Sequence, residues 1–561
     1  MNEQNAVVKW LCSKTGSAIL FLVWTLFITS LWLPRNWGFY GNGDWDLTYS
    51  TFEVARKSIV DYGQWPHYNP FLAYGSDLDV NPQAAHYSIF FLPILLFGAF
   101  YGYKISIILA ILIGLFYTNK LLRLIGSEPI HSVLLSLFFC SMPFLGQHII
   151  GAGHSNFLNF YLIPALFVTY TKFLKSGQFR ILSLATLILL QFISSGAPFV
   201  FIVAVLMILL WLIGLTISKR IKAKQSVLML STVVLSIGMG LWKLIPVMEF
   251  WSVSPRLVND DSQINLLVWL HALNNSPTDT GTPHDWHEIT IGTGIIVPIL
   301  IIAYRQYIPQ FKIWLGLFLL VLWVSFGNQP TVANPWYLIH HHLPFFNGLR
   351  APYRFAFILV FALLIGLSLI GKYLKDNNLI LIILLSISLT NSLSFNSLSR
   401  NLVHTPRIEE IKIESPSNYT VRNLGNDYPF QYKCLQQNQF LISAYEPMHL
   451  PEVKDTLETF VVGGSLKHFT PQKITITSID SISKLALRYS GNWSVSEGAT
   501  LSNFKGLIAI SSKPGTNVVL SYKNPSTERG LLYSLPFFIL FLLGFYPYRF
   551  LSITIQAAVD L

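Results

Sequence analysis

The chain has 561 residues, of which 52% are hydrophobic and only 12% are charged, a composition typical of a polytopic membrane protein. Its net charge of +11 does not indicate nucleic-acid binding, because the basic residues cluster beside apolar segments, where they anchor and orient a membrane chain. Three scattered cysteines, Cys12, Cys140 and Cys434, exclude a disulfide framework and a thiolate metal site.

Apolar segments recur along the chain, and a bilayer core of about 30 Å requires about 20 apolar residues for each helix that crosses it. The first segment follows Lys9 and Lys14 and lacks a small-residue cleavage site, so we expect a retained signal anchor. Residues 87–100 contain Pro93 and are expected to lie along the membrane surface. The sequence predicts about twelve spans: residues 17–33, 101–118, 131–145, 157–174, 181–193, 199–217, 227–246, 289–304, 313–325, 354–370, 379–392 and 531–546.

Basic residues gather on alternate connections between these spans. By the positive-inside rule these connections face the cytoplasm, as do both termini. The basic connections are 120–123, 172–180, 219–224, 305–312 and 372–375. The long polar loops then face outward: 35–86, 147–156, 251–288, 327–352 and 393–530.

Residues 393–530 differ in composition from the rest, with alternating stretches such as "KITITSI" and "NVVLSYK" separated by turn signals. They predict a β-sandwich-like outer domain, between a membrane domain at 1–392 and a last span with a cytoplasmic tail at 531–561. The predicted fold is therefore a polytopic α-helical membrane protein with a C-terminal extracytoplasmic β-rich domain. No P-loop, dinucleotide fingerprint or HExxH zinc motif occurs, so ATP hydrolysis and zinc proteolysis have no support.

The loop at 35–86 places "GDWD" directly after the first span and contains five aspartates: Asp44, Asp46, Asp61, Asp77 and Asp79. One interpretation is that the first two acids cap a helix that begins near Leu47, with the tryptophan at the membrane interface. The other is a functional site, because a mere connector does not need so many acids and aromatic residues.

Several stretches resemble the GT-C superfamily of membrane glycosyltransferases, and in particular the large bacterial members that glycosylate lipoteichoic acid or other envelope polymers. They are "GDWD", "ARKSIVDYGQWPHYNP", "NPQ", "GHSNFLNFYLIP", "KLIPVMEFWSVSPR", "FNGLRAPYRF" and "YSGNWSVSEG", in this order from about residue 41 to 525. The resemblance implies a donor sugar on a polyprenyl phosphate and an acceptor that is an envelope glycan, lipid or protein.

The resemblance also implies that Asp44 is the catalytic base, with Asp46 as a supporting acid; both could instead hold a divalent cation such as Mg²⁺ or Mn²⁺. Direct displacement of the phosphate by the acceptor would invert the anomeric centre. For the phosphate we expect Arg350 and Arg354, since they lie at the outer end of a span where the positive-inside rule does not require them. His154 is a further candidate donor, and the alternative for all three is an ordinary surface or interface role.

Other polar and aromatic residues of the outer face are candidates for lining the site. Glu249 and Arg256 could pair with each other or bind substrate. Residues 286–288, "WHE", precede a span and could line the site or anchor the interface. The aromatic candidates, which an interface would also attract, are Trp65, Tyr68 and Tyr74.

Three functions are compatible with this pattern. The first is a GT-C type hexosyl- or pentosyltransferase in a bacterial inner membrane, with its active site outside the cytoplasm. The second is a transporter or flippase of lipid-linked glycans, which would require charged residues in the middle of spans, where this sequence has few. The third is an envelope scaffold, for which a dozen spans are more than anchoring needs.

Overall fold

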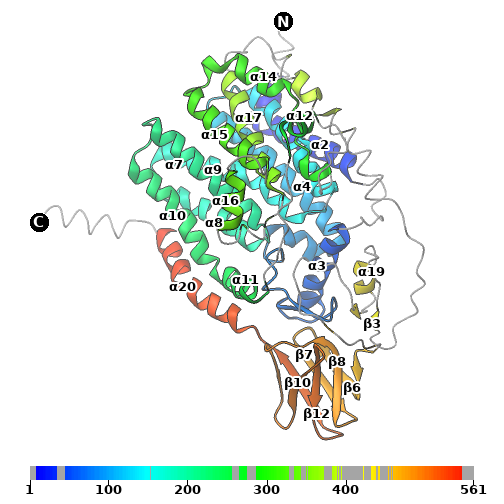
Figure 1. Ribbon diagram of the computed structural model, residues 1–561. Helices are drawn as coiled ribbons and strands as arrows, with labels where there is room; N and C mark the ends of the chain where they lie inside the picture. The colour runs from blue at the N-terminus through cyan, green and yellow to red at the C-terminus, as the bar shows by residue number, and fades with distance from the viewer. Residues whose placement is uncertain are drawn as a thin grey trace, which may run out of the picture.

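The computed structural model describes residues 8–33, 44–151, 153–254, 264–274, 286–327, 334–342, 351–371 and 461–545, with shorter pieces between 346 and 460. A bundle of helices forms the larger part, and two β-sheets near the C-terminal end lie at one end of it (Figure 1). This arrangement confirms the predicted fold class, a polytopic helical protein with a C-terminal β-rich part.

Most of the helices follow one another from near the N-terminus to residue 371, and α19 and α20 come later in the chain. Their bounds are α2 (Lys14–Trp32), α3 (Asp44–Val60), α4 (Leu92–Leu124), α5 (Pro129–Cys140), α6 (Pro143–Gly146), α7 (Ile163–Ser176), α8 (Arg180–Ser194), α9 (Pro198–Ile217), α10 (Ala223–Met239), α11 (Leu241–Val253), α12 (Leu266–Leu273), α13 (Trp286–Ile289), α14 (Ile296–Ala303), α15 (Phe311–Ser325), α16 (Pro335–His342), α17 (Ala356–Gly371), α19 (Gln431–Gln436) and α20 (Pro525–Phe545).

Within the described residues, seven helices are long and apolar enough to cross a membrane, or eight if the bent pair α10 and α11 forms one span. Two more predicted spans are the shorter apolar helices α8 and α15. The predicted span at 289–304 is broken, because Gly292 and Gly294 both have positive φ and only α14 continues it. Of the predicted span at 379–392, the structure describes residues 379, 382–387, 389 and 390, all of them helical.

The segment predicted to lie along the membrane surface is a separate helical piece. A 3₁₀ turn, Ile89–Phe91, leads into α4, and Gly98 interrupts α4 with φ 79° and ψ 163°. A side chain at such a φ is disfavoured, so glycine allows the chain to turn sharply here. The long span of α4 therefore begins after Gly98, close to the predicted residue 101.

The β-rich part is a sandwich of two four-stranded antiparallel sheets with one shared core. Alternation predicted these strands correctly: in "KITITS" the side chains of Ile474 and Ile476 are buried, and their neighbours are at least partly exposed apart from the terminal serine. One sheet has the order β10 (Thr500–Phe504), β11 (Leu507–Ser511), β8 (Ile482–Arg488) and β5 (Val461–Val462); the other has β6 (Gly464–Thr470), β7 (Lys473–Ser478), β12 (Asn517–Tyr522) and β9 (Trp493–Val495).

The sandwich is joined to the bundle by buried contacts. A short hairpin of the first loop, β1 (Tyr68–Asn69) and β2 (Ser76–Asp77), packs into the sandwich core. A parallel pair, β3 (Val421–Arg422) and β4 (Phe440–Leu441), flanks α19, which packs against α3. After the last strand, α20 runs along α11 and α10 (Figure 1).

Candidate active site

A polar cavity of about 120 Å³ opens where the start of α3, the start of α9 and the start of the α17 span meet. Asp44, His154 and Arg354, three of the residues singled out in the sequence, all line it. Loop residues Asn81 and Gln83 add amide groups to the wall, and the remaining lining is Leu47, Thr48, Thr51, Phe52, Pro82, Ala85, Ser155, Asn156, Pro198, Phe199, Trp251 and Leu349.

The first turn of α3 is fixed to the loop that carries His154. The indole Nε1 of Trp45 donates to the carbonyl of Ile150 (2.7 Å), and Thr48 Oγ1 donates to the carbonyl of Gly153 (2.9 Å). Gly153 has φ +71°, and a Cβ there would lie 2.7 Å from the backbone nitrogen of Trp45. The close approach therefore requires glycine at this position, and it places the next residue, His154, beside α3.

Asp44 and His154 form a direct pair, with 2.9 Å between Asp44 Oδ2 and His154 Nε2. Their side chains are 30% and 17% exposed, so both remain accessible from the cavity. A carboxylate beside an imidazole can accept a proton from a hydroxyl while the imidazole holds the carboxylate in one orientation.

Asp46 faces a different part of the molecule. Helix α3 begins at Asp44 rather than near Leu47, so residues 44 and 46 are about 200° apart around the helix axis. Asp46 is buried, and its two oxygens accept hydrogen bonds from the backbone N–H groups of Gln431 and Tyr432 (3.0 and 3.1 Å), at the start of α19. Burial raises the pKa of Asp46 to about 7, against the lowering effect of those two hydrogen bonds. The structure thus gives Asp46 a helix-capping contact and does not join it with Asp44 in a two-acid metal site.

Arg354 lines the cavity and is held from behind by Glu288. Its Nε donates to Glu288 Oε2 (2.6 Å) and its Nη2 donates to Oε1, which makes a two-pronged pair. The guanidinium also lies over the rings of Phe157 (5.5 Å) and Phe199 (5.9 Å). Arg354 holds the pKa of the buried Glu288 well below its usual range, although burial alone would raise it. An arginine held in this way keeps Nη1 for a ligand.

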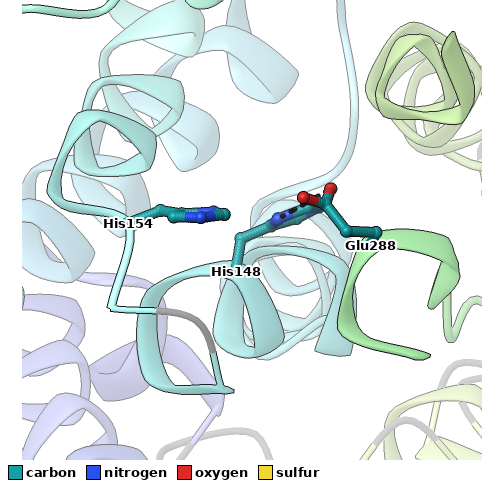
Figure 2. Close-up of side chains that lie close together, drawn as sticks. All are labelled: His148, His154 and Glu288. Atoms are coloured by element: carbon teal, nitrogen blue, oxygen red, sulfur yellow. Dashed lines mark ion pairs between the residues drawn. The ribbon is translucent and has the colours of Figure 1, made fainter. Parts of the chain in front are cut away.

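His148 completes a cluster with His154 and Glu288. It lies on a π-helical turn, Gln147–Gly151, and its ring stacks on Phe157 with centroids 4.0 Å apart. Figure 2 shows the two histidines of this loop extending toward Glu288 of α13. His148 Nδ1 lies 3.7 Å from Glu288 Oε2, and one donor atom from each of the three residues lies within 4.8 Å of the others.

The loop of residues 78–83, of which 81–83 line the cavity, is held by Lys243, which follows the bend between α10 and α11. The buried ammonium donates to the carbonyls of Leu78, Asp79 and Asn81 (3.3, 3.2 and 2.8 Å). Asp79 in turn accepts from His67 Nδ1 and Thr527 Oγ1, each at 2.7 Å. The cavity wall is thereby tied to a helix of the bundle and to α20.

Other candidates from the sequence lie away from the cavity. Tyr68 and Tyr74, predicted to line the site, are buried in the sandwich core, where Tyr68 packs against Trp493 and Tyr522, and neither lines this cavity. Trp65 is exposed and donates to Tyr87 OH (2.9 Å). Glu249 pairs with Arg529 of α20 (2.7 Å) at the surface and does not line the cavity. Arg350 and Arg256 lie outside the described residues.

Sequence reasoning missed His148 and did not single out Glu288 from its neighbours. One signal was available: "HIIGAGH" places two histidines six residues apart in a loop already predicted to share a face with "GDWD". Glu288 gave no such signal, because an acid before an apolar span also suits an interface. Only the packing of α13 on the π-helical turn and on the turn Pro352–Phe355 brings the three together.

A second, apolar cavity of about 320 Å³ lies among α7, α9, α15 and α17. It is lined by the later part of α9 and by residues after 357 of α17, whereas the polar cavity is lined by the beginnings of α9 and of the α17 span. The two cavities share no lining residue.

The fold and the site together define a class, a membrane-embedded helical protein with a polar cavity at the end of the bundle that carries a β-sandwich. No protein-family model matches the chain, and no curated protein sequence matches it. Among solved structures, it is similar to the arabinofuranosyltransferase AftD from Mycobacteria, with a TM-score of 0.46 and 12% sequence identity. The match covers 69% of this chain and 27% of that chain, so the chain spans about a quarter of the length of that protein.

Proposed function

We propose that this protein is a glycosyltransferase of the GT-C type, which moves a sugar from a polyprenyl-phosphate carrier to an acceptor hydroxyl on the extracytoplasmic side. The observation that carries the proposal is the convergence of Asp44, His154 and Arg354 on one polar cavity at the end of a bundle of apolar helices. A lipid-linked donor needs such a place, where a polar reaction site adjoins the membrane.

Asp44 is the general base in this proposal. It accepts the proton of the acceptor hydroxyl as the hydroxyl oxygen attacks the anomeric carbon, and the bond from that carbon to the phosphate oxygen breaks. His154 Nε2, 2.9 Å from Asp44 Oδ2, holds the carboxylate toward the cavity. Attack opposite the leaving phosphate inverts the anomeric centre, which NMR of the product would test: a retained configuration contradicts direct displacement.

Arg354 binds the leaving phosphate in this proposal. Of the five N–H donors of an arginine, the one on Nε and one on Nη2 are directed at Glu288, and the Nη1 pair together with the second N–H of Nη2 remains for phosphate oxygens. Negative charge on the phosphate grows as the bond breaks, so a fixed guanidinium stabilises the transition state more than the ground state. Glu288 prevents the side chain from turning away when no donor is bound.

The test is release of free polyprenyl phosphate by the purified chain in lipid nanodiscs, with polyprenyl-phosphate hexoses and pentoses as donors and an envelope extract as acceptor. Loss of a general base typically lowers the rate of the catalysed step by about 10²- to 10⁴-fold, so Asp44→Asn should reduce the rate of polyprenyl phosphate release by at least about 100-fold. Asp61→Asn is the matched control, an exposed acid just after the same helix that pairs with Lys57 (3.9 Å). Full release by Asp44→Asn would refute the assignment of the base.

Transport of lipid-linked glycans is the alternative function, and a broken helix such as α10 and α11 occurs in many transporters. Two observations favour the enzyme. The polar and apolar cavities share no lining residue, and the buried Lys243 at the bend donates to loop carbonyls, which is a structural role. Movement of lipid-linked glycan across vesicles without consumption of any donor would favour transport instead.

A further inference from the structure

The cluster of His148, His154 and Glu288 sits directly beside the cavity, and its combined donor set suits a further role besides the positioning of Asp44 and Arg354. Two imidazoles and one carboxylate are the ligands of many catalytic zinc sites, which keep a further position open for water or substrate. Nitrogen donors also favour first-row transition metals over Mg²⁺ and Ca²⁺, which prefer oxygen ligands.

The spacing of the donors fits a bridging ion better than a hydrogen bond. His148 Nδ1 and Glu288 Oε2 are 3.7 Å apart, beyond the usual N–H···O range of about 2.7 to 3.2 Å. Two ligands that each lie about 2.1 Å from a tetrahedral ion are about 3.4 Å from each other. The third donor lies within 4.8 Å of both, so a small inward movement of one side chain closes the site.

The surroundings of the cluster also suit a metal ion. His148 is fully buried and Glu288 is 6% exposed at its side chain, with the rings of Phe144 and Phe157 against His148. Metal-binding histidines commonly have a carboxylate on their other ring nitrogen, and Asp44 lies 2.9 Å from His154 Nε2. Arg354 donates to both Glu288 oxygens and so fixes the orientation of this ligand.

We propose that His148, His154 and Glu288 bind one divalent first-row transition-metal ion of the Zn²⁺ or Mn²⁺ type at the edge of the polar cavity. The ion replaces the metal site expected from Asp44 and Asp46, whose side chains have separate partners. If the proposed glycosyl transfer is correct, the ion lies beside Arg354, and the two cations together face the leaving phosphate. Metal binding itself does not depend on that reaction.

The experiment measures Zn²⁺ binding to the full chain in nanodiscs, after removal of any affinity tag and of bound metal with a chelator. Isothermal titration and elemental analysis should find one tight Zn²⁺ per chain and much weaker binding of Mg²⁺. His148→Phe, which keeps a planar ring on Phe157, and His154→Gln should each weaken Zn²⁺ binding by about 10-fold or more. The control is the double variant His341→Ala and His342→Ala, which removes two exposed imidazoles and should leave the tight site unchanged.

Each outcome decides the proposal. A wild-type chain that binds no tight Zn²⁺, or a tight site that persists in both His148→Phe and His154→Gln, overturns it. Because His148→Phe keeps the apolar contact, an unchanged unfolding midpoint shows that weaker binding reflects a lost ligand rather than a lost fold. If the chain consumes donor equally with and without chelator and binds no tight metal, the metal site is refuted and the transferase is not. If the chain binds one tight metal but consumes no donor, the transferase is refuted and the metal site is not.

Discussion

The pair between Glu288 and Arg354 supports the candidate site, and Glu288→Gln tests how much the fold depends on it. The two side chains are 6% and 15% exposed, so both charges are largely removed from water. Two charge-assisted hydrogen bonds contribute roughly 1.5 to 3 kcal/mol each, and removal of one member of a buried pair typically costs about 3 to 5 kcal/mol. Because Gln keeps one acceptor and Arg354 borders the cavity, we expect the lower end, about 3 kcal/mol of the free energy of unfolding.

The assay is unfolding of the purified chain in detergent by increasing SDS, followed by tryptophan fluorescence in the presence of a chelator. Glu249→Gln is the matched control, since the Glu249–Arg529 pair is about half exposed on both sides and an exposed pair contributes at most about 1 kcal/mol. The double variant Glu288→Met and Arg354→Met removes both charges, so it should be more stable than Glu288→Gln. If Glu288→Gln unfolds at the same SDS content as the wild type, or if the double variant is the least stable of the three, the reasoning about desolvated charge is refuted.

Three further predictions concern the elements around the cavity. Burial raises the folded-state pKa of Asp46 from 3.8 to about 7, so the folded state binds this proton more tightly than the unfolded state. The free energy of unfolding should therefore fall as the pH rises from about 4 to 7, by up to about 4 kcal/mol. Asp46→Asn should flatten this pH dependence in unfolding curves at pH 5 and 8, and a variant whose stability depends on pH as steeply as the wild type would contradict it. Lys243→Met leaves three loop carbonyls without their donor, which should lower the unfolding midpoint and speed hydrogen exchange across residues 78–83; unchanged exchange would argue against the anchoring role. In Gly153→Ala the new Cβ would lie 2.7 Å from the backbone nitrogen of Trp45, at a φ of +71° that disfavours a side chain. Donor consumption should fall even where the unfolding midpoint shows that the chain is folded. Wild-type donor consumption by this variant would show that the close approach is dispensable.

The sequence predicted best the features that depend on local pattern. Long apolar runs predicted α2, α9 and α17, and strict alternation predicted β7 and β12. The shorter apolar runs were less informative, because two glycines with positive φ divide the predicted span at 289–304 and a bend of 67° divides the one at 227–246. Apolar composition alone does not reveal such breaks.

The site depended on long-range packing and was predicted only in part. Asp44, His154 and Arg354 were selected one by one, and the fold brings them to one cavity. Asp46 was grouped with Asp44 because the two acids stand one residue apart in "GDWD" and because of the family resemblance; a helix that begins at Asp44 turns the two acids apart. Tyr68 and Tyr74 resembled interface aromatics, but the hairpin that carries them is covered by a domain that begins almost 400 residues further along the chain.

The opposite orientation of the two acids of "GDWD" has a mechanical consequence. A single turn of α3 presents Asp44 to the cavity and Asp46 to the first amides of α19, so neither contact can shift without moving the same rigid segment. A ligand in the cavity that displaces this turn therefore changes the contact with residues 431–436. By linkage, a partner that binds residues 431–436 changes the affinity of the cavity for its ligand by the same free energy by which that ligand changes the affinity of the partner. The two-residue spacing of the aspartates in "GDWD" thus connects the cavity and α19 through one turn of α3.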